Sequence, residues 1–172
     1  SYESTDLQST LNDVLDTFSE AISEYNIEIT VIALPTISAI PFLIEQLFTN
    51  LISNAIKYRS KEKQAKITIE SNKVHGKQIP HNFIKTHAYY HRIKVKDNGI
   101  GFKEEDSEKV FRLFKRLHDK EEYSGTGLGL AICHKIVMKH KGFIYATSVP
   151  DKGSIFTIYL PSGRLHPLLK NP

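Results

Sequence analysis

Apolar residues recur every three or four positions in three stretches of the chain, which predicts three helices. The first stretch covers residues 7–24. The second covers about 41–58 and opens with a proline, a residue well suited to the first turn of a helix. The third covers about 128–140, and we expect Gly142 to cap it.

Shorter apolar or alternating runs predict about five strands. These are "IEITVIALP", "AKITIES" and "HRIKVKD", followed by "FIYATSV" and "SIFTIYL", which the turn "PDKG" joins into a hairpin. A polar connector over 73–90 and a charged, irregular stretch over 101–124 with one helical patch, "VFRLFKRL", complete the pattern. Three helices on one face of a mixed sheet would bury the apolar stripes, so we expect an α+β fold arranged as a two-layer α/β sandwich.

Length and composition narrow the class of protein. The chain has 172 residues, of which 40% are hydrophobic and 24% charged, as expected for one globular domain. No apolar run reaches the roughly 20 residues that span a bilayer, and no signal peptide opens the sequence. The one cysteine, Cys133, excludes an internal disulfide and fits a reducing compartment. The net charge of +4 is scattered along the chain, which disfavours a nucleic-acid partner.

The predicted helix over 41–58 carries a polar stripe beside its apolar one. The stripe consists of Asn50, Asn54, Lys57 and Tyr58. Amide oxygens can bind a hard cation such as Mg²⁺, a lysine can meet a phosphate, and a tyrosine ring can pack on a base. The alternative is an ordinary solvated helix face.

A second polar feature follows the strand "HRIKVKD". That strand ends at Asp97, and the chain then turns through Asn98, Gly99, Ile100 and Gly101. A carboxylate at a strand end can accept a hydrogen bond from an exocyclic amine, and the two glycines let the backbone approach a flat ligand. The alternative is a hairpin turn, although the charged run that follows does not read as a strand.

Three glycines in "GTGLGLA" stand at the start of the third predicted helix. Unpaired amide groups at a helix start can bind phosphate. The stretch lacks the Gly-Lys-Ser/Thr ending of a P-loop, and its spacing is not that of the dinucleotide fingerprint. The sequence also lacks the His-Arg-Asp and Val-Ala-Ile-Lys motifs of protein kinases.

In this order, the features resemble the ATP-binding catalytic domain of sensor histidine kinases, of the superfamily that includes gyrase, Hsp90 and MutL. The resemblance covers roughly residues 5–161. It lies in "NLISNAIKY", "DNGIGF", "FRLFKRLHDKEEYSGTGLGLAICHKIV" and "GSIFTIYLP", the third of which is most similar to the phytochrome-like branch. It implies a Bergerat-type fold with a flexible ATP lid, a catalytic domain over 1–161 and an irregular tail over 162–172.

The resemblance also implies roles for matching residues. Asn54 would bind Mg²⁺ with help from Asn50, Lys57 would meet phosphate, and Tyr58 would flank the nucleotide. Asp97 would bond the adenine amino group, in a pocket shaped by Gly99 and Gly101. The remaining implied residues belong to the lid: Phe111 and Phe114 as anchors, Arg116 for the γ-phosphate, and Gly125, Thr126, Gly127, Leu128 and Gly129 as hinge and phosphate cradle.

The family transfers the γ-phosphoryl group of ATP to a histidine on a dimerisation domain, and a response regulator then receives it. None of the eight histidines lies in a motif like that of the phosphoryl-accepting histidine, so we expect this chain to contain the catalytic domain without the dimerisation domain. We expect it to be a cytoplasmic monomer without membrane contact. Asn50 stands where gyrase-like relatives have a glutamate that activates water, so we expect little ATP hydrolysis. The alternatives are a nucleotide-binding regulatory or docking module and a serine kinase of the anti-sigma type.

The polar connector holds His81, His87 and His91, whose spacing fits no zinc pattern. We therefore expect structural or solvated histidines there.

Overall fold

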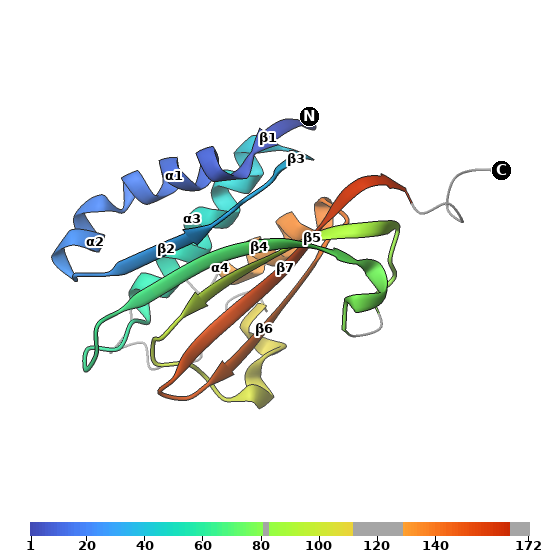
Figure 1. Cartoon of the computed structure of the whole chain (residues 1–172). Helices are drawn as coiled ribbons and strands as arrows, with labels where there is room; N and C mark the ends of the chain where they lie inside the picture. The colour runs from blue at the N-terminus through green and yellow to red at the C-terminus, as the bar shows by residue number, and fades with distance from the viewer. Residues whose placement is uncertain (81–82, 112–128, 166–172) are drawn as a thin grey trace.

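The computed structural model describes residues 1–80, 83–111 and 129–165 (Figure 1). Its helices are α1 (Leu7–Thr17), α2 (Ser19–Glu24), α3 (Pro41–Lys57) and α4 (Gly129–Lys139), with short 3₁₀ turns η1 (Gly76–Gln78), η2 (Glu104–Asp106) and η3 (Lys109–Phe111). Its strands are β1 (Glu3–Asp6), β2 (Glu28–Ile32), β3 (Thr36–Ala39), β4 (Lys66–His75), β5 (His87–Asp97), β6 (Phe143–Val149) and β7 (Gly153–Leu165).

Five strands form one mixed sheet in the order β2-β4-β5-β7-β6. β2 runs parallel to β4, and the other neighbours are antiparallel. The helices α1, α3 and α4 cover one face of this sheet (Figure 1). Their apolar stripes meet alternate residues of β4, β5, β6 and β7 in a single core cluster. The predicted α+β sandwich is confirmed.

Helix α3 lies at the centre of the core and carries the polar stripe. Pro41 occupies its first turn, and seven side chains spaced along it are buried. It ends at Tyr58, whose N–H still bonds to the carbonyl of Asn54 at 3.1 Å. The strongly buried face holds the helix in one rotational setting, so the edge with Asn50 and Asn54 has a defined direction.

The helix predicted over 7–24 is two helices. Asp6 caps α1, because its Oδ1 accepts hydrogen bonds from the N–H groups of Gln8 and Ser9 at 3.0 and 3.2 Å. The chain leaves helical geometry at Phe18 (φ −96°, ψ 10°) and resumes as α2. The pattern also missed β1 and β3, two four-residue strands that pair with each other at the start of α3.

At the end of α4, the left-handed conformation is adopted by a different residue from the one that we expected. It is Lys141 (φ 59°), and Gly142 follows it with its N–H on the carbonyl of Val137 at 2.9 Å. This is the bond of a Schellman cap one residue earlier than expected. Gly142 is needed for space instead, because a Cβ there would collide with the carbonyl oxygen of Tyr159.

The polar connector over 73–90 has a structural purpose. β4 and β5 extend into it, and Ile79 and Phe83 from its remainder pack on the sheet face that the helices leave open. Phe83 stacks on Phe143 with ring centroids 4.6 Å apart, beside the buried rings of Tyr90 and Tyr159. The connector therefore covers a second, aromatic core. The irregular tail predicted over 162–172 is wrong for residues 162–165, which belong to β7, and residues 166–172 lie outside the described residues.

Candidate functional site

The loop after β5 is joined directly to the end of α3. The N–H of Ile100 donates to the carbonyl oxygen of Tyr58 at 3.0 Å. Gly99 is buried at this junction, and a Cβ there would collide with the same carbonyl oxygen. The two polar features that the sequence singled out, the stripe on α3 and the loop from Asp97, therefore meet in space.

Asp97 is held at the end of β5 by main-chain donors. Its Oδ1 accepts a hydrogen bond from the N–H of Gly99 at 2.9 Å, and the main chain of Ser154 donates to it as well. Burial raises the pKa of the Asp97 carboxyl to about 6, against these hydrogen bonds and the charge of Lys63. A desolvated, oriented carboxylate whose pKa lies near neutral pH is suited to accept a hydrogen bond from a ligand amine.

The β6–β7 hairpin supports this loop from the other side. Gly101 (φ +66°) and Gly153 (φ +124°) both lie where a Cβ would collide with main-chain atoms of the opposing segment. The buried hydroxyl of Ser148 accepts from the N–H of Phe102 at 2.9 Å and donates to the carbonyl of Gly153 at 2.7 Å. These contacts leave the loop little freedom to move relative to the hairpin.

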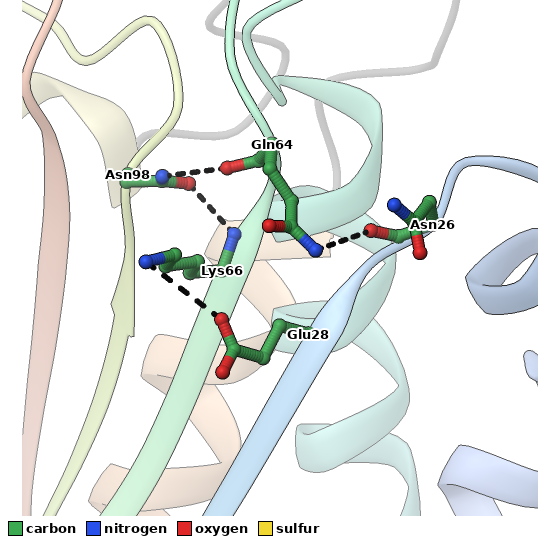
Figure 2. Close-up of polar contacts among 5 residues, drawn as sticks. All are labelled: Asn26, Glu28, Gln64, Lys66 and Asn98. Carbon is green, nitrogen blue, oxygen red and sulfur yellow. Dashed lines mark hydrogen bonds and ion pairs between the residues drawn. The ribbon is translucent and has the colours of Figure 1, made fainter.

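Asn98 ties the same loop to the start of β4, as Figure 2 shows. Its Oδ1 accepts from the N–H of Lys66 at 2.8 Å, and its Nδ2 donates to the carbonyl of Gln64 at 2.9 Å. Gln64 in turn reaches the carbonyl of Asn26, and Lys66 pairs with Glu28 at 3.8 Å. The side chain of Asn98 therefore holds the loop in place. Because β5 is followed by the 3₁₀ turn η2 and not by a strand, the hairpin-turn alternative for this stretch is wrong.

On α3, Asn50 stands next to the start of α4. The Cβ position of Gly129 is 3.6 Å from Asn50 Oδ1. Asn50 Nδ2 is buried and has no hydrogen-bond partner among the residues that the structure describes. A buried, unpaired donor costs free energy unless a ligand or water satisfies it. Lys57 and Tyr58 lie at the far end of the stripe, with Lys57 Nζ 5.7 Å from the Tyr58 ring centroid.

The lid residues can be placed only in part. Phe114, Arg116, Gly125, Thr126, Gly127 and Leu128 lie outside the described residues. Phe111 is described, and its ring packs edge-on against Phe156 with centroids 6.1 Å apart. Gly129 begins α4.

Sequence reasoning missed the residues that position the loop, which are Asn98, Ser148 and Ser154. Ser154 follows Gly153 in the motif "GSIFTIYLP", and Asn98 lies inside the loop itself. Ser148 gave no local signal, because its importance comes from contacts with residues 46 positions away. Within ranges 1–80, 83–111 and 129–165, no three histidine, cysteine or acidic residues gather in a metal-binding arrangement.

Comparison with protein families identifies the family to which this chain belongs. Residues 39–164 match the family described as "Histidine kinase-, DNA gyrase B-, and HSP90-like ATPase". The chain belongs to this family. The match spans α3, the loop from Asp97, α4 and the closing hairpin of this ATPase domain.

Relatives and solved structures agree with the family. Cyanobacterial phytochrome A of Nostoc sp. is 36% identical over 162 residues, which are 94% of this chain and 19% of the relative. Phytochrome-like protein Cph1 of Synechocystis sp. is 36% identical over 159 residues, which are 92% and 19%. The chain thus spans about a fifth of the length of these relatives. Their names agree with the resemblance to the phytochrome-like branch.

Among solved structures, the catalytic domain of histidine kinase ThkA superposes with a TM-score of 0.72 at 27% identity, covering 94% of this chain and 97% of that one. Full-length ShkA, solved in complex with AMPPNP, gives 0.72 at 23% identity, covering 94% and 31%. In the part of this ATPase domain that the structure describes, no helix is long and apolar enough to cross a membrane.

Proposed function

We propose that this ATPase domain binds Mg²⁺-ATP between the polar edge of α3 and the loop from Asp97, as the catalytic domain of a sensor histidine kinase. The observation that carries the proposal is the junction itself. A desolvated, oriented carboxylate at Asp97 is fixed by the Ile100–Tyr58 bond beside a helix whose Asn50 has an unsatisfied amide donor.

In this proposal the base lies at the Tyr58 end of the polar edge, and the phosphates extend from Lys57 toward Asn50. Asp97 accepts a hydrogen bond from the adenine amino group, and Gly99 and Gly101, which pack against the main chain of Tyr58 and Val149, shape the pocket for the ring. Tyr58 flanks the nucleotide, and Lys57 meets phosphate. The unpaired Asn50 amide donates to a phosphate oxygen or to water near it, while Gly129, without a side chain, leaves that approach open.

Asn54 with Asn50 would hold the Mg²⁺ ion through amide oxygens, which are ligand types that this hard cation accepts. When bound, the ion supplies charge neutralisation between the phosphates. From the lid, Phe114 would serve as an anchor, Arg116 would reach the γ-phosphate, and Gly125, Thr126, Gly127 and Leu128 would cradle the triphosphate.

The reaction we propose is transfer of the γ-phosphoryl group to a histidine of the parent kinase's dimerisation domain. The bond between the γ-phosphorus and the β,γ-bridging oxygen breaks, and this oxygen leaves with ADP. A phosphorus–nitrogen bond forms, and the imidazole gives up its N–H proton to solvent. A response regulator then accepts the group. Asn50 is an amide and cannot act as a general base toward water, so we propose that hydrolysis by this chain alone is slow.

Calorimetric titration with Mg²⁺-AMPPNP tests the binding step. We expect wild-type protein to bind and both Asp97→Asn and Asn54→Ala to lose most of the affinity while each still unfolds in a single cooperative transition. Adding the dimerisation domain and ATP should produce acid-labile phosphohistidine. Binding without transfer would favour the regulatory module, acid-stable phosphoserine would favour the serine kinase, and fast hydrolysis lost on Asn54→Ala would contradict the role given to Asn50.

A further inference from the structure

We infer that a cavity at the start of β5 is a binding site for a small oxyanion that carries an apolar group, of the phosphate- or sulfate-monoester type. The cavity has a volume of about 640 Å³, which is in the range of small-molecule pockets. It is lined by His91, whereas the proposed nucleotide site lies at Asp97, at the other end of the same strand and roughly 20 Å away at about 3.3 Å per residue. The two sites are therefore separate.

The cavity lies between parts of the chain that are fixed to one another. Its walls are the start of β5 with the end of β7, the segment after α4, and the small sheet of β1 and β3. Tyr2, just before β1, joins this small sheet to α4. Its hydroxyl donates to the carbonyl of Lys139 at 2.9 Å, and its ring packs edge-to-face on His140 with centroids 5.5 Å apart. The walls are thus held in place without a ligand.

Basic groups converge on the cavity without an acidic partner. The imidazoles of His87 and His91 and the exposed Lys141 line it, and no carboxylate lies among its described lining residues. Lys141 forms no ion pair within the described part of the chain. Burial together with a neighbouring ammonium group lowers the pKa of both histidines, with Lys141 acting on His87 and Lys73 of β4 acting on His91. Such a set of groups favours an anion among them.

The lining also offers hydrogen-bond donors that are not engaged elsewhere. Neither ring nitrogen of His91 has a hydrogen-bond partner among the described residues. His87 has Nε2 to offer, because only its Nδ1 is engaged, with the hydroxyl of Thr86 at 2.8 Å. Four hydroxyl groups without a side-chain partner in ranges 1–80, 83–111 and 129–165 complete the polar lining: Ser4, Thr36, Ser38 and Ser162.

A metal ion fits this lining poorly. His140 also lines the cavity, but both of its ring nitrogens are engaged, Nε2 with the N–H of Ile40 at 3.0 Å and Nδ1 with the carbonyl of Ile136 at 2.8 Å. That leaves two imidazoles, and the described lining holds no cysteine or carboxylate to join them. Zinc sites take three or four such protein ligands. The donor-rich, cationic lining therefore favours an anion.

Apolar groups on the lining indicate that the ligand is larger than an inorganic ion. Ile37, Leu160 and Pro161 line the cavity beside the polar groups, and Tyr2, which is 51% exposed, lies at its rim. An inorganic ion would fill little of a cavity of about 640 Å³ and would leave these apolar groups in water. A ring or short chain on the oxyanion would cover them.

Binding should be coupled to protonation of the two free histidines. An anion beside His87 and His91 favours their charged forms and opposes the effects of burial and of Lys141 and Lys73. β1, β3 and β7 contribute no charged side chain to the described lining, and Asp6 at the end of β1 caps α1 instead. Binding should therefore tighten as pH falls from about 7.5 to about 5.5, by up to about tenfold per pH unit for each proton taken up.

Phenyl sulfate is a suitable probe, because its charge stays constant over this pH range. Inorganic sulfate lacks its ring, and benzyl alcohol lacks its charge. Titrations of the whole chain, with and without saturating AMPPNP, are followed in ¹⁵N–¹H spectra at the amides of Lys141 and Ser162. We expect phenyl sulfate to shift both amides equally well in the two conditions, and the comparison ligands to bind at least about tenfold more weakly.

Several results would overturn the inference. These are no change at Lys141 and Ser162, displacement of phenyl sulfate by AMPPNP, and equal binding of either comparison ligand. A response of the same amides to Zn²⁺ but not to phenyl sulfate would assign the cavity to a metal instead.

A charge-removing variant tests the role of Lys141. Lys141→Gln should weaken the binding of phenyl sulfate about 3- to 30-fold. The matched control is Lys139→Gln, at an exposed position of α4 that is not among the described lining residues, and it should leave the affinity unchanged. Equal affinities in the two variants would contradict the placement of the anion beside Lys141.

The histidines are tested by the pH dependence of binding. His91→Gln keeps a hydrogen-bond donor but cannot be protonated, so the dependence of affinity on pH should become shallower. If this variant does not fold, imidazole ¹³C–¹H spectra of the wild type decide the same point. The pKa of His91 should rise when phenyl sulfate is bound, and an unchanged value would overturn the coupling.

Discussion

The main-chain N–H of Ile100 and the carbonyl oxygen of Tyr58, 3.0 Å apart, connect the two halves of the candidate site. Tyr58 ends the helix that carries Asn50 and Asn54, and Ile100 belongs to the loop that begins at Asp97. The bond uses one of the carbonyl groups that every helix leaves unpaired at its C-terminus. It sets the position of the Asp97 carboxylate relative to the polar edge of α3.

Gly99→Ala should separate these two halves. Its Cβ would collide with the Tyr58 carbonyl oxygen, so the loop must shift, and we expect a loss of about 1–3 kcal/mol in the free energy of unfolding together with loss of AMPPNP binding. Gly142→Ala is the matched control, since its Cβ would collide with the Tyr159 carbonyl oxygen away from the site. Urea unfolding and calorimetry should show similar destabilisation in both and lost affinity only in Gly99→Ala. Equal affinities in the two variants would contradict the role of the junction.

The raised pKa of Asp97 predicts a specific dependence of stability on pH. The folded-state value is about 6 against an ordinary value of 3.8, so between these values the folded protein holds a proton that the unfolded chain has released. Stability should therefore fall as pH rises from about 4 to about 6, by up to about 3 kcal/mol from this group.

Asp97→Asn should remove that contribution while keeping an acceptor for the N–H of Gly99. Urea unfolding at several pH values between 4 and 7 measures the effect as the difference between wild type and variant. Parallel curves for the two proteins would show that Asp97 does not titrate in this window.

Asn98 should contribute to stability through two separate hydrogen bonds. Asn98→Ala removes the acceptor for the N–H of Lys66 and the donor to Gln64, and we expect a loss of about 1–2 kcal/mol in the free energy of unfolding. Asn98→Asp keeps the acceptor and should lose less. Urea midpoints compare the three proteins, and equal destabilisation by both substitutions would contradict the assignment of Oδ1 to Lys66.

His140 connects α4 to the start of α3. Its Nε2 accepts from the N–H of Ile40 at 3.0 Å, so Nδ1 must carry the proton that it shares with the carbonyl of Ile136 at 2.8 Å. We expect long-range ¹H–¹⁵N spectra to show the neutral Nδ1–H tautomer.

His140→Phe fills the same buried space but leaves the Ile40 N–H without its acceptor. We expect it to lose about 1–3 kcal/mol in the free energy of unfolding. An Nε2–H tautomer in the wild-type spectrum, or an undiminished stability in the variant, would show that this bond does not form in solution.

The elements that local pattern predicted well are those with a long, one-sided apolar face. Helix α3 and strand β6 fall within one residue of their expected bounds, whereas β7 begins within one residue of its expected start and continues five residues beyond Leu160. Short elements were missed, because β1 and β3 have four residues each and are defined by pairing with each other across the chain. The break at Phe18 was missed because the apolar spacing continues through it, with Phe18 itself, Ala21 and Ile22 packed on the same core.

By itself, the sequence determined which residue types could carry the chemistry, because helical spacing puts Asn50 and Asn54 on one edge and a strand ends at Asp97. It also determined the family, through motifs whose residue types and order are specific. Only the tertiary structure decided that the carboxylate and the helix edge are joined, and that Ser148 and Asn98 hold the loop. These relationships depend on hydrogen bonds between segments far apart in the chain, and local pattern carries no record of such contacts.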